Sequence, residues 1–167
     1  TFQFAKVPFM IGFLHSEKAN ESMASRIDWL QNRLGAELFS ILFPLLLTDR
    51  GTEFEKHQLF ELDQLGNTRL HIFYCDPMQS SQKPHVENNH NYVRDIIPNS
   101  YPLDGLTQDS IDLMFSHINS APRLSLGDKS PFEVFSFIYG EEAVKCLNIR
   151  KIERDDVILK PYLIYSK

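Results

Sequence analysis

The 167-residue chain carries a formal net charge of −5, and 43% of its residues are hydrophobic. This composition excludes a disordered chain, the length suits one domain, and the acidic balance gives no sign of nucleic-acid binding. Apolar runs such as LFPLLL are too short to span a bilayer, so we expect no membrane segment. No secretory signal is visible, and two cysteines offer neither a disulfide framework nor a metal cluster, so we expect a cytoplasmic protein.

The first third of the chain is predicted to form strands and one helix. The stretch FQFAKVPFMIGFLH is rich in Phe and Ile and is interrupted at Pro8, which is typical of two short strands. Apolar residues recur at helical spacing over residues 22–34, and Gly35 suits the C-terminal cap of that helix. The helical period turns Asp28 toward water. The run LLLT, residues 45–48, is expected to be a strand buried on both faces.

The remaining pattern predicts a short helix, a strand and then helices, over residues 55–62, 70–75, 86–97, 107–119, 130–139 and 141–147. Thr107 is expected to cap its helix. Ser130 and Glu133 form a capping box with proline at the first helical position, and Gly140 ends that helix. We expect the aromatic side chains of this helix to pack in the core: Phe132, Phe135, Phe137 and Tyr139.

The order of strands and helices favours an α/β domain with a mixed sheet. We assign residues 1–150 to this domain and residues 151–167 to an extended tail. The end of the chain is locally basic, since residues 145–167 carry six Lys or Arg and three acids.

Two acids stand where a metal site could form. Asp49 follows the strand 45–48, and ligands of open α/β sheets bind outside the carboxyl ends of strands. Glu87 begins a helix further along the chain, and a hard cation such as Mg²⁺ needs carboxylates that converge from separate elements. The alternatives are an Asx turn at Asp49 and, at Glu87, a first-turn acid that faces the helix dipole. A zinc hydrolase using His85 and His90 is a further alternative, although they are five positions apart rather than four.

Six phrases occur in an order that is similar to a known family: LTDRGTEF (47–54), IFYCDP (72–77), QKPHVENNH (82–90), LMFSHINSAPR (113–123), SPFEVFSFIYG (130–140) and LKPYL (159–163). Together they resemble the integrase-type catalytic core of bacterial DDE transposases, specifically the insertion-sequence-thirty family. The resemblance runs from about Phe9 to about Leu163. It implies an RNase H-like fold, with a central mixed β-sheet flanked by α-helices, and cleavage and joining of DNA by a two-metal site that uses Mg²⁺ or Mn²⁺.

The resemblance also assigns roles to residues. Asp49 matches the second acid of the family's catalytic triad and Glu87 the last, and both are expected to bind metal. The family's first acid lies on a strand upstream of a segment like TFQFAKVPFMIGFL, so this fragment is expected to lack it and to be inactive. The residues expected to contact DNA are Asn88, Asn89, Arg94 and Arg123.

Three positions depart from the family pattern. Pro84 and Ser100 stand where glycine is usual, and Asp95 stands where a basic residue is usual. With the acidic net charge, they support the alternative of a catalytically incomplete DNA-binding or dimerisation module. The intact parent is expected to act on the element's terminal repeats and on target DNA, as a homodimer or higher oligomer and without a membrane partner.

Overall fold

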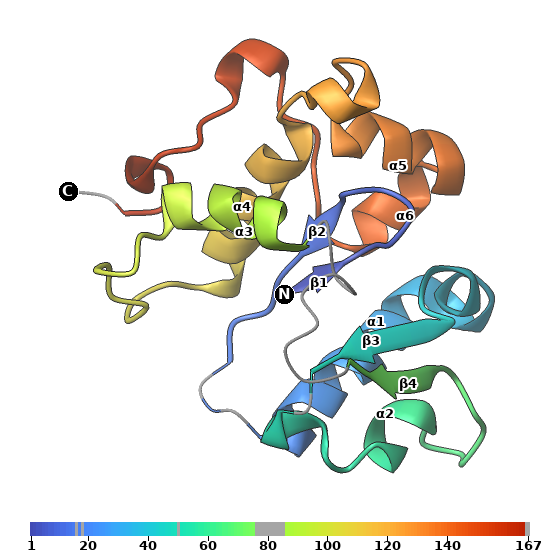
Figure 1. Ribbon diagram of the computed structural model, residues 1–167. Coiled ribbons are helices and arrows are strands. Elements are labelled where there is room, and N and C mark those ends of the chain that lie inside the picture. Colours follow the sequence, from blue (N-terminus) through green and yellow to red (C-terminus); the bar gives the residue numbers. More distant parts are fainter. Residues whose placement is uncertain (16, 18, 50, 76–85, 166–167) are drawn as a thin grey trace. The chain divides into compact units, whose positions relative to one another are not determined.

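The computed structural model describes residues 1–15, 17, 19–49, 51–75 and 86–165, and of residues 86–88 the backbone alone. The chain divides into two compact units, whose elements are labelled in Figure 1. The helical unit comprises Thr1–Leu14 and Pro84–Lys167, and the strand-pair unit comprises His15–Lys83.

The helical unit combines a two-stranded antiparallel sheet with helices. β1 (Phe2–Gln3) pairs with β2 (Met10–Ile11). The helices and 3₁₀ turns of this unit are α3 (Val86–Ile96), α4 (Gln108–Ser120), η3 (Leu124–Leu126), α5 (Pro131–Tyr139), α6 (Glu141–Cys146), η4 (Arg154–Asp156) and η5 (Pro161–Leu163). Because α4 contacts β2, α3 and α5, it is the central element of the unit (Figure 1).

Aromatic rings fill the core of the helical unit beside β2. The ring of Phe135 on α5 stacks on that of Phe9, with centroids 4.1 Å apart, and meets the ring of Phe4 edge-on at 4.9 Å. The side-chain amide of Asn119 on α4 accepts the Met10 N–H at 2.8 Å and donates to the Met10 carbonyl at 2.7 Å. Since buried backbone groups must find hydrogen-bond partners, the buried Asn119 fixes β2 against α4.

The helix termini of the helical unit confirm the predicted caps. The Thr107 hydroxyl accepts the backbone N–H of Ser110 at the start of α4. At the start of α5, Ser130 and Glu133 each accept the other's backbone N–H, which completes the capping box. Gly140 ends α5 with a φ of 87°, a conformation that glycine adopts without steric cost. Local sequence therefore sets the ends of these two helices.

One prediction about α5 is wrong. Phe135 is fully buried, but Phe137 is 91% exposed. Positions two apart lie on nearly opposite faces of an α-helix, so the aromatic series cannot all face one core. The physical reason is thus the helical period itself.

Residues 151–165 contain the two 3₁₀ turns η4 and η5, where the sequence predicted an extended tail. Between these turns, the backbone N–H of Ile158 donates to Nδ1 of His117 on α4 at 3.0 Å. The division of the chain at residue 150 stays a prediction.

The strand-pair unit begins with α1 (Asn20–Leu42), which is broken at Gly35. Gly35 has φ 74° and ψ 161°, a conformation that favours glycine, so the predicted end of the first helical segment is confirmed. A second helical segment follows and leads into β3 (Leu45–Thr48). The other elements are η1 (Thr52–Phe54), α2 (Gln58–Glu61) and β4 (His71–Tyr74).

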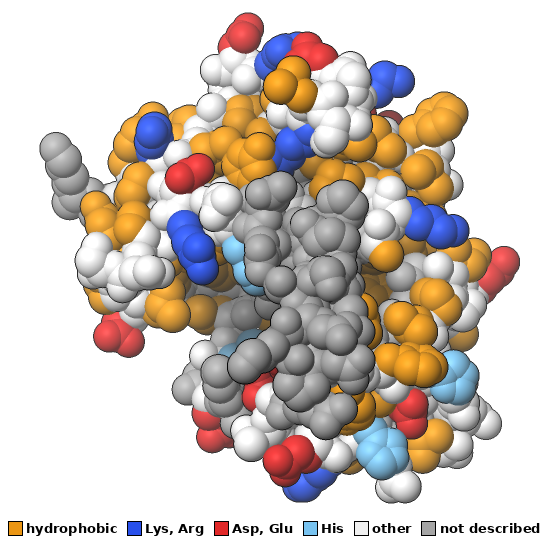
Figure 2. Space-filling model, viewed as in Figure 1, with side chains coloured by type: hydrophobic (Ala, Val, Ile, Leu, Met, Phe, Trp, Pro, Cys, Tyr) orange, Lys and Arg blue, Asp and Glu red, His pale blue; other side chains and the backbone are white. Residues whose placement is uncertain are grey.

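β3 and β4 pair in parallel, and their register places Leu45 beside His71 and Leu47 beside Phe73. Three apolar side chains on this side of the pair are exposed, and we call them the open face: Leu45 (51%), Leu47 (41%) and Phe73 (54%). Figure 2 shows apolar side chains at the surface over these strands. The prediction of a strand buried on both faces is therefore wrong, because the side chains of the open face are about half exposed.

The architecture is mixed α/β, as predicted. In the part of the chain that the structure describes, the strands form two separate two-stranded sheets, one in each unit. No helix in that part is long and apolar enough to cross a membrane.

Candidate functional site

Asp49 lies directly after β3, at the carboxyl end of the parallel strand pair. The backbone N–H of Cys75 donates to the Thr48 carbonyl at 2.8 Å, so the two strands stay paired up to this edge. The Asp49 side chain is exposed. Because it is exposed, Asp49 is accessible to a ligand from solvent. It also lies at the edge where ligands of open α/β sheets bind.

The loop after Asp49 also fits the Asx turn that the sequence left open. One carboxylate oxygen of Asp49 accepts the backbone N–H of Gly51 at 3.3 Å. A Cβ at Gly51 would lie 2.6 Å from a carboxylate oxygen of Glu53, so a larger residue here would displace the end of that side chain. The turn occupies one oxygen of Asp49 and leaves acceptor capacity on the carboxylate, because a carboxylate has several lone-pair sites.

A hollow of about 360 Å³ adjoins this loop and is lined by Gly51, Glu55, His57 and Tyr74. The Tyr74 hydroxyl donates to the Phe54 carbonyl at 2.5 Å. Burial raises the pKa of the Tyr74 hydroxyl, and the charges of Glu61 and Glu55 raise it further, so the phenol stays neutral. Tyr74 therefore holds the loop against the end of β4.

A complete metal site is not found among the described residues, because no three His, Cys, Asp or Glu side chains converge there. Oxygen donors of the Asp49 type suit a hard divalent cation such as Mg²⁺ or Mn²⁺. The chemistry of Asp49 therefore fits the expected metal, and further ligands must come from elsewhere.

Glu87 and Asn88 lie in the first turn of α3, so the predicted helix is confirmed. Their side chains lie outside the described residues. Because Asp49 belongs to the strand-pair unit and Glu87 to the helical unit, their shared metal site stays a prediction. Pro84 and His85 also lie outside the described residues, so the zinc alternative with His85 and His90 stays untested.

Two other predicted DNA contacts on α3 differ in exposure. Arg94 is exposed in the last turn of the helix, where its charge also suits the helix dipole. Asn89 is 5% exposed, and its side-chain nitrogen finds no acceptor among the described residues. Of these two, Arg94 is the one placed to reach a phosphate without rearrangement.

Arg123 lies inside the helical unit and is 6% exposed. Its guanidinium lies over the ring of Tyr92, with the central carbon 3.4 Å from the ring centroid. One nitrogen, Nη2, donates to the Ile118 carbonyl at 3.0 Å, while Nε and Nη1 find no acceptor among the described residues. Burial lowers the pKa of Arg123 to about 10, so it is still protonated at neutral pH. Its contact with DNA stays a prediction, and its observed partners are within the protein.

The sequence missed an ion pair in the strand-pair unit, between a partly exposed acid and a buried arginine. Asp28 was expected to face water, but its carboxylate accepts a hydrogen bond from the buried guanidinium of Arg69. Arg69 also donates to the Gln31 side chain and to the carbonyls of Leu59 and Phe60. The pair joins α1 to α2 and explains why an acid occurs on the inner side of α1.

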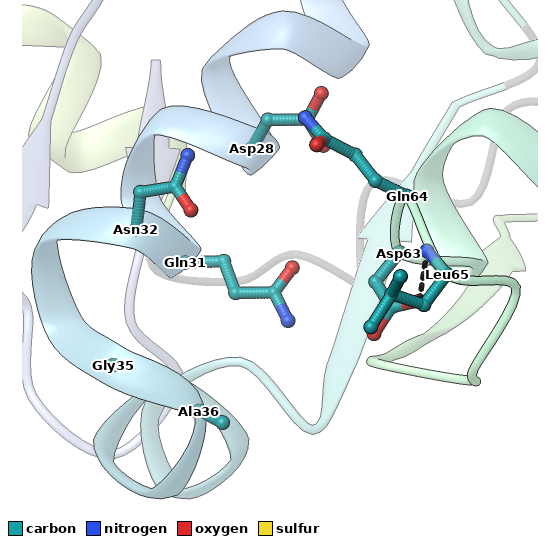
Figure 3. Close-up of a pocket in the computed structure, with 8 residues that line it drawn as sticks. All are labelled: Asp28, Gln31, Asn32, Gly35, Ala36, Asp63, Gln64 and Leu65. Atoms are coloured by element: carbon teal, nitrogen blue, oxygen red, sulfur yellow. Dashed lines mark hydrogen bonds between the residues drawn. The ribbon is translucent and has the colours of Figure 1, made fainter.

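A second hollow, of about 350 Å³, lies between α1 and the turn after α2 (Figure 3). Its acids are already engaged within the protein. Asp28 pairs with Arg69, and Asp63 accepts the backbone N–H groups of Leu65 and Asn67 in its own turn. Both acids of this hollow thus serve the fold of the strand-pair unit.

Comparison with curated proteins finds insertion-sequence transposases. Transposase InsI for insertion sequence element IS30A of Escherichia coli (strain K12) is 32% identical over 89 residues, which cover 53% of this chain and 22% of that protein. The transposase for insertion sequence element IS4351 of Bacteroides fragilis is 25% identical over 138 residues, covering 75% of this chain and 41% of that protein. The transposase for insertion sequence element IS1086 of Cupriavidus metallidurans is 29% identical over 103 residues, covering 60% and 29%.

The chain thus spans less than half the length of the curated relatives it matches. No family model matches the chain, and no solved structure matches it. The curated relatives confirm the resemblance to insertion-sequence transposases of the IS30 type.

Proposed function

We propose that this chain, which is related to the insertion-sequence transposases of the IS30 type, is part of a DDE catalytic core that cleaves and joins DNA by phosphoryl transfer. The observation that carries the proposal is the exposed Asp49 at the carboxyl end of β3, within the phrase LTDRGTEF. The intact parent would act on the terminal repeats of its element and on target DNA. We expect it to work as a homodimer or larger assembly, in the cytoplasm with the DNA.

In this proposal Asp49 and Glu87 hold the divalent cations. A pair of Mg²⁺ or Mn²⁺ ions, when bound, would activate the attacking oxygen and stabilise the leaving one. The Gly51 N–H orients the Asp49 carboxylate, and Tyr74 holds the adjoining loop. Arg94 supplies an exposed positive charge for a DNA phosphate.

We further propose that the intact core has an RNase H-like fold, in which one central sheet carries these acids. The open face supports this idea, since Leu45, Leu47 and Phe73 expose apolar surface that a larger sheet and its covering helices would bury. The parallel pairing of β3 and β4 also supports the idea, because Asp49 follows the carboxyl end of β3 and ligands of open α/β sheets bind outside such strand ends.

In this proposal Asp49 and Glu87 are two acids of a set of three, so the chain alone is expected to bind metal weakly and to transfer no strands. The test is a cleavage assay with Mn²⁺ on terminal-repeat DNA. The parent transposase should be active, Asp49→Asn should abolish its activity, and this chain alone should be inactive. The matched control is Asp104→Asn, the same change at an exposed loop residue, which should leave the parent active. Robust turnover by the chain alone would contradict the predicted inactivity.

The alternative function is a non-catalytic DNA-binding or dimerisation module, which the net charge of −5 and Asp95 support. Titration with Mn²⁺, followed by paramagnetic broadening of NMR signals, separates the two functions. Broadening at both Asp49 and Glu87, lost in Asp49→Asn and kept in Asp104→Asn, would support the catalytic proposal. Binding of DNA without any broadening at these acids would support the alternative.

A further inference from the structure

Arg123 has an unusual combination of burial, charge and rigid anchoring. Its backbone is fixed in the turn before α5, where its N–H donates to the Lys129 carbonyl and its carbonyl accepts the N–H groups of Leu126 and Asp128. Its side chain is buried, and an isolated charge is costly to bury. The described contacts must therefore offset a substantial desolvation cost.

The first contact provides a hydrogen-bond donor for a backbone carbonyl at the C-terminal end of α4. In a helix, the Ile118 carbonyl would accept the N–H of the residue four positions later, but that residue is Pro122, which has no N–H. Nη2 of Arg123 donates to this carbonyl instead, at 3.0 Å. Arg123 thus acts as a side-chain cap for α4.

The second contact reaches α3. Tyr92 lies in the middle of α3, and the central carbon of the Arg123 guanidinium lies over its ring, 3.4 Å from the centroid. A cation over an aromatic ring is stabilised by the ring's quadrupole, more strongly when both groups are desolvated. One guanidinium therefore joins the end of α4 to the middle of α3.

We propose that Arg123 is a positioning residue, which holds α3 in place through Tyr92 while it caps α4, rather than a direct contact to DNA. Its catalytic meaning rests on the proposed function, because α3 is the helix that carries Glu87. A direct phosphate contact needs donors that reach the solvent, and the guanidinium is almost completely covered. Among the described residues no carboxylate pairs with Arg123, so stacking and capping are the interactions that replacement would remove.

The two contacts of Arg123 require a side chain that is both planar and a hydrogen-bond donor. The planar guanidinium can stack on a ring and donate to a carbonyl in the same pose, whereas the ammonium of lysine is a compact point charge. Arg123→Lys should therefore loosen α3 although the charge is kept. Tyr92→Leu should loosen it too, while Tyr92→Phe keeps the aromatic face and should not.

The experiment is amide hydrogen exchange of the chain, measured by mass spectrometry on fragments from α3 and α5. In Arg123→Lys and in Tyr92→Leu, exchange in α3 should become about tenfold faster, with α5 unchanged. The double variant should exchange no faster than either single variant, because both changes break one contact. The matched control is Arg94→Lys, the same change at an exposed position of α3. Hydrogen exchange in α3 of this variant should be as slow as in the wild type.

Two results would overturn the proposal: exchange in α3 that is as slow in Arg123→Lys as in Arg94→Lys, or equal acceleration in α3 and α5. If Arg123→Lys does not fold, Tyr92→Leu against Tyr92→Phe decides by the same criterion. DNA binding at two salt concentrations provides a second readout. A smaller salt dependence in Arg123→Gln, which removes the charge, with unchanged exchange in α3, would assign the residue to DNA contact instead. If the chain bound neither metal nor DNA, the proposed function would fail while the exchange result for α3 would still stand.

Discussion

The helical unit and the strand-pair unit treat apolar side chains differently. In the helical unit the rings of Phe4, Phe9 and Phe135 pack against one another, and Asn119 satisfies the backbone of β2 beside them. In the strand-pair unit, Leu47 and Phe73 sit side by side in register and are both exposed. The first unit encloses its own core, while the second has a face that needs another element to cover it.

This difference shows that the burial of a strand depends on the elements that pack against it, and not on the sequence of the strand alone. A helix with a capped start and an apolar stripe finds its partners within the helical unit. A pair of strands has two faces and two edges, and the described part of the strand-pair unit covers one face. Substitutions in each unit can test this difference between the two units through their effect on stability.

The largest effect is expected inside the helical unit. Phe135→Ala removes a fully buried ring that contacts Phe4, Phe9 and Tyr139, and should lower the free energy of unfolding by about 3–5 kcal/mol. Phe137→Ala, two positions along the same helix, should cost less than about 0.5 kcal/mol because its ring is in solvent. Urea denaturation followed by circular dichroism measures both values. Equal losses would show that Phe137 is covered.

A smaller effect is expected in the strand-pair unit. Asp28→Ala leaves the buried Arg69 guanidinium without its carboxylate, and should cost about 2–3 kcal/mol, less than a fully buried pair because Asp28 is partly exposed. Fluorescence of Trp29, the only tryptophan of the chain, reports unfolding of this unit directly. The exposed acid Glu37, changed to alanine, is the control and should have little effect. An Asp28→Ala variant as stable as the wild type would mean that the ion pair adds nothing.

Replacing an apolar side chain of the open face by a polar one is expected to change the stability of the strand-pair unit only slightly. Phe73→Ser exchanges an exposed ring for a small polar side chain, and should change the free energy of unfolding by less than about 1 kcal/mol. Ile72→Ser, the neighbouring strand residue with a buried side chain, is the matched comparison and should be clearly destabilising. Trp29 fluorescence follows both variants. A large loss for Phe73→Ser would mean that another part of the protein covers this face in solution.

The smallest expected effect is a pH dependence at His117. Its Nδ1 accepts the Ile158 N–H and must be unprotonated, and burial followed by the charge of Arg150 lowers its pKa, against the opposing charge of Asp156. As the pH falls below the ordinary histidine value of about 6.5, the unfolded chain takes up a proton that the folded chain resists. Stability that is complete at higher pH should therefore be lost as the pH falls from this value through the lowered pKa.

His117→Asn tests this interpretation, because its side-chain oxygen can accept the same hydrogen bond without titrating. We expect a smaller loss of stability between pH 7 and the acid range in this variant, and slower acid-induced exchange of the Ile158 amide by NMR. His15, whose pKa burial also lowers, contributes to both proteins and provides a constant background. Identical pH profiles for the variant and the wild type would rule out His117 as their source.

The sequence predicted best what local chemistry decides. The capping box at Ser130 and Glu133, the cap at Thr107 and the break at Gly35 depend on residues that are neighbours along the chain, and the structure contains each of them. The apolar run 45–48 likewise predicted a strand, and Asp49 follows it as expected. These features need no knowledge of distant contacts.

The misses depend on distant contacts. Nothing in the stretch NTRLHIF distinguishes Arg69 from a surface arginine, since its partners Asp28 and Gln31 lie about forty positions earlier. The predicted contact of Arg123 with DNA stays a prediction, but the burial of this residue against Tyr92 was not expected from its phrase and is visible only in three dimensions. The predicted metal pair of Asp49 and Glu87 has the same dependence, so it can be settled only by metal binding or by chemistry.

The break at Gly35 has a consequence for the direction in which the chain enters β3. A continuous helix over the 23 residues of α1 would be about 35 Å long and would carry its last turn straight ahead. The backbone at Gly35 instead redirects the second segment, and only Phe43 and Pro44 separate its end from β3, the strand that leads to Asp49. A side chain at position 35 would disfavour this conformation. The direction in which β3 delivers the chain to Asp49 would then change, although the substituted residue lies 14 positions before Asp49.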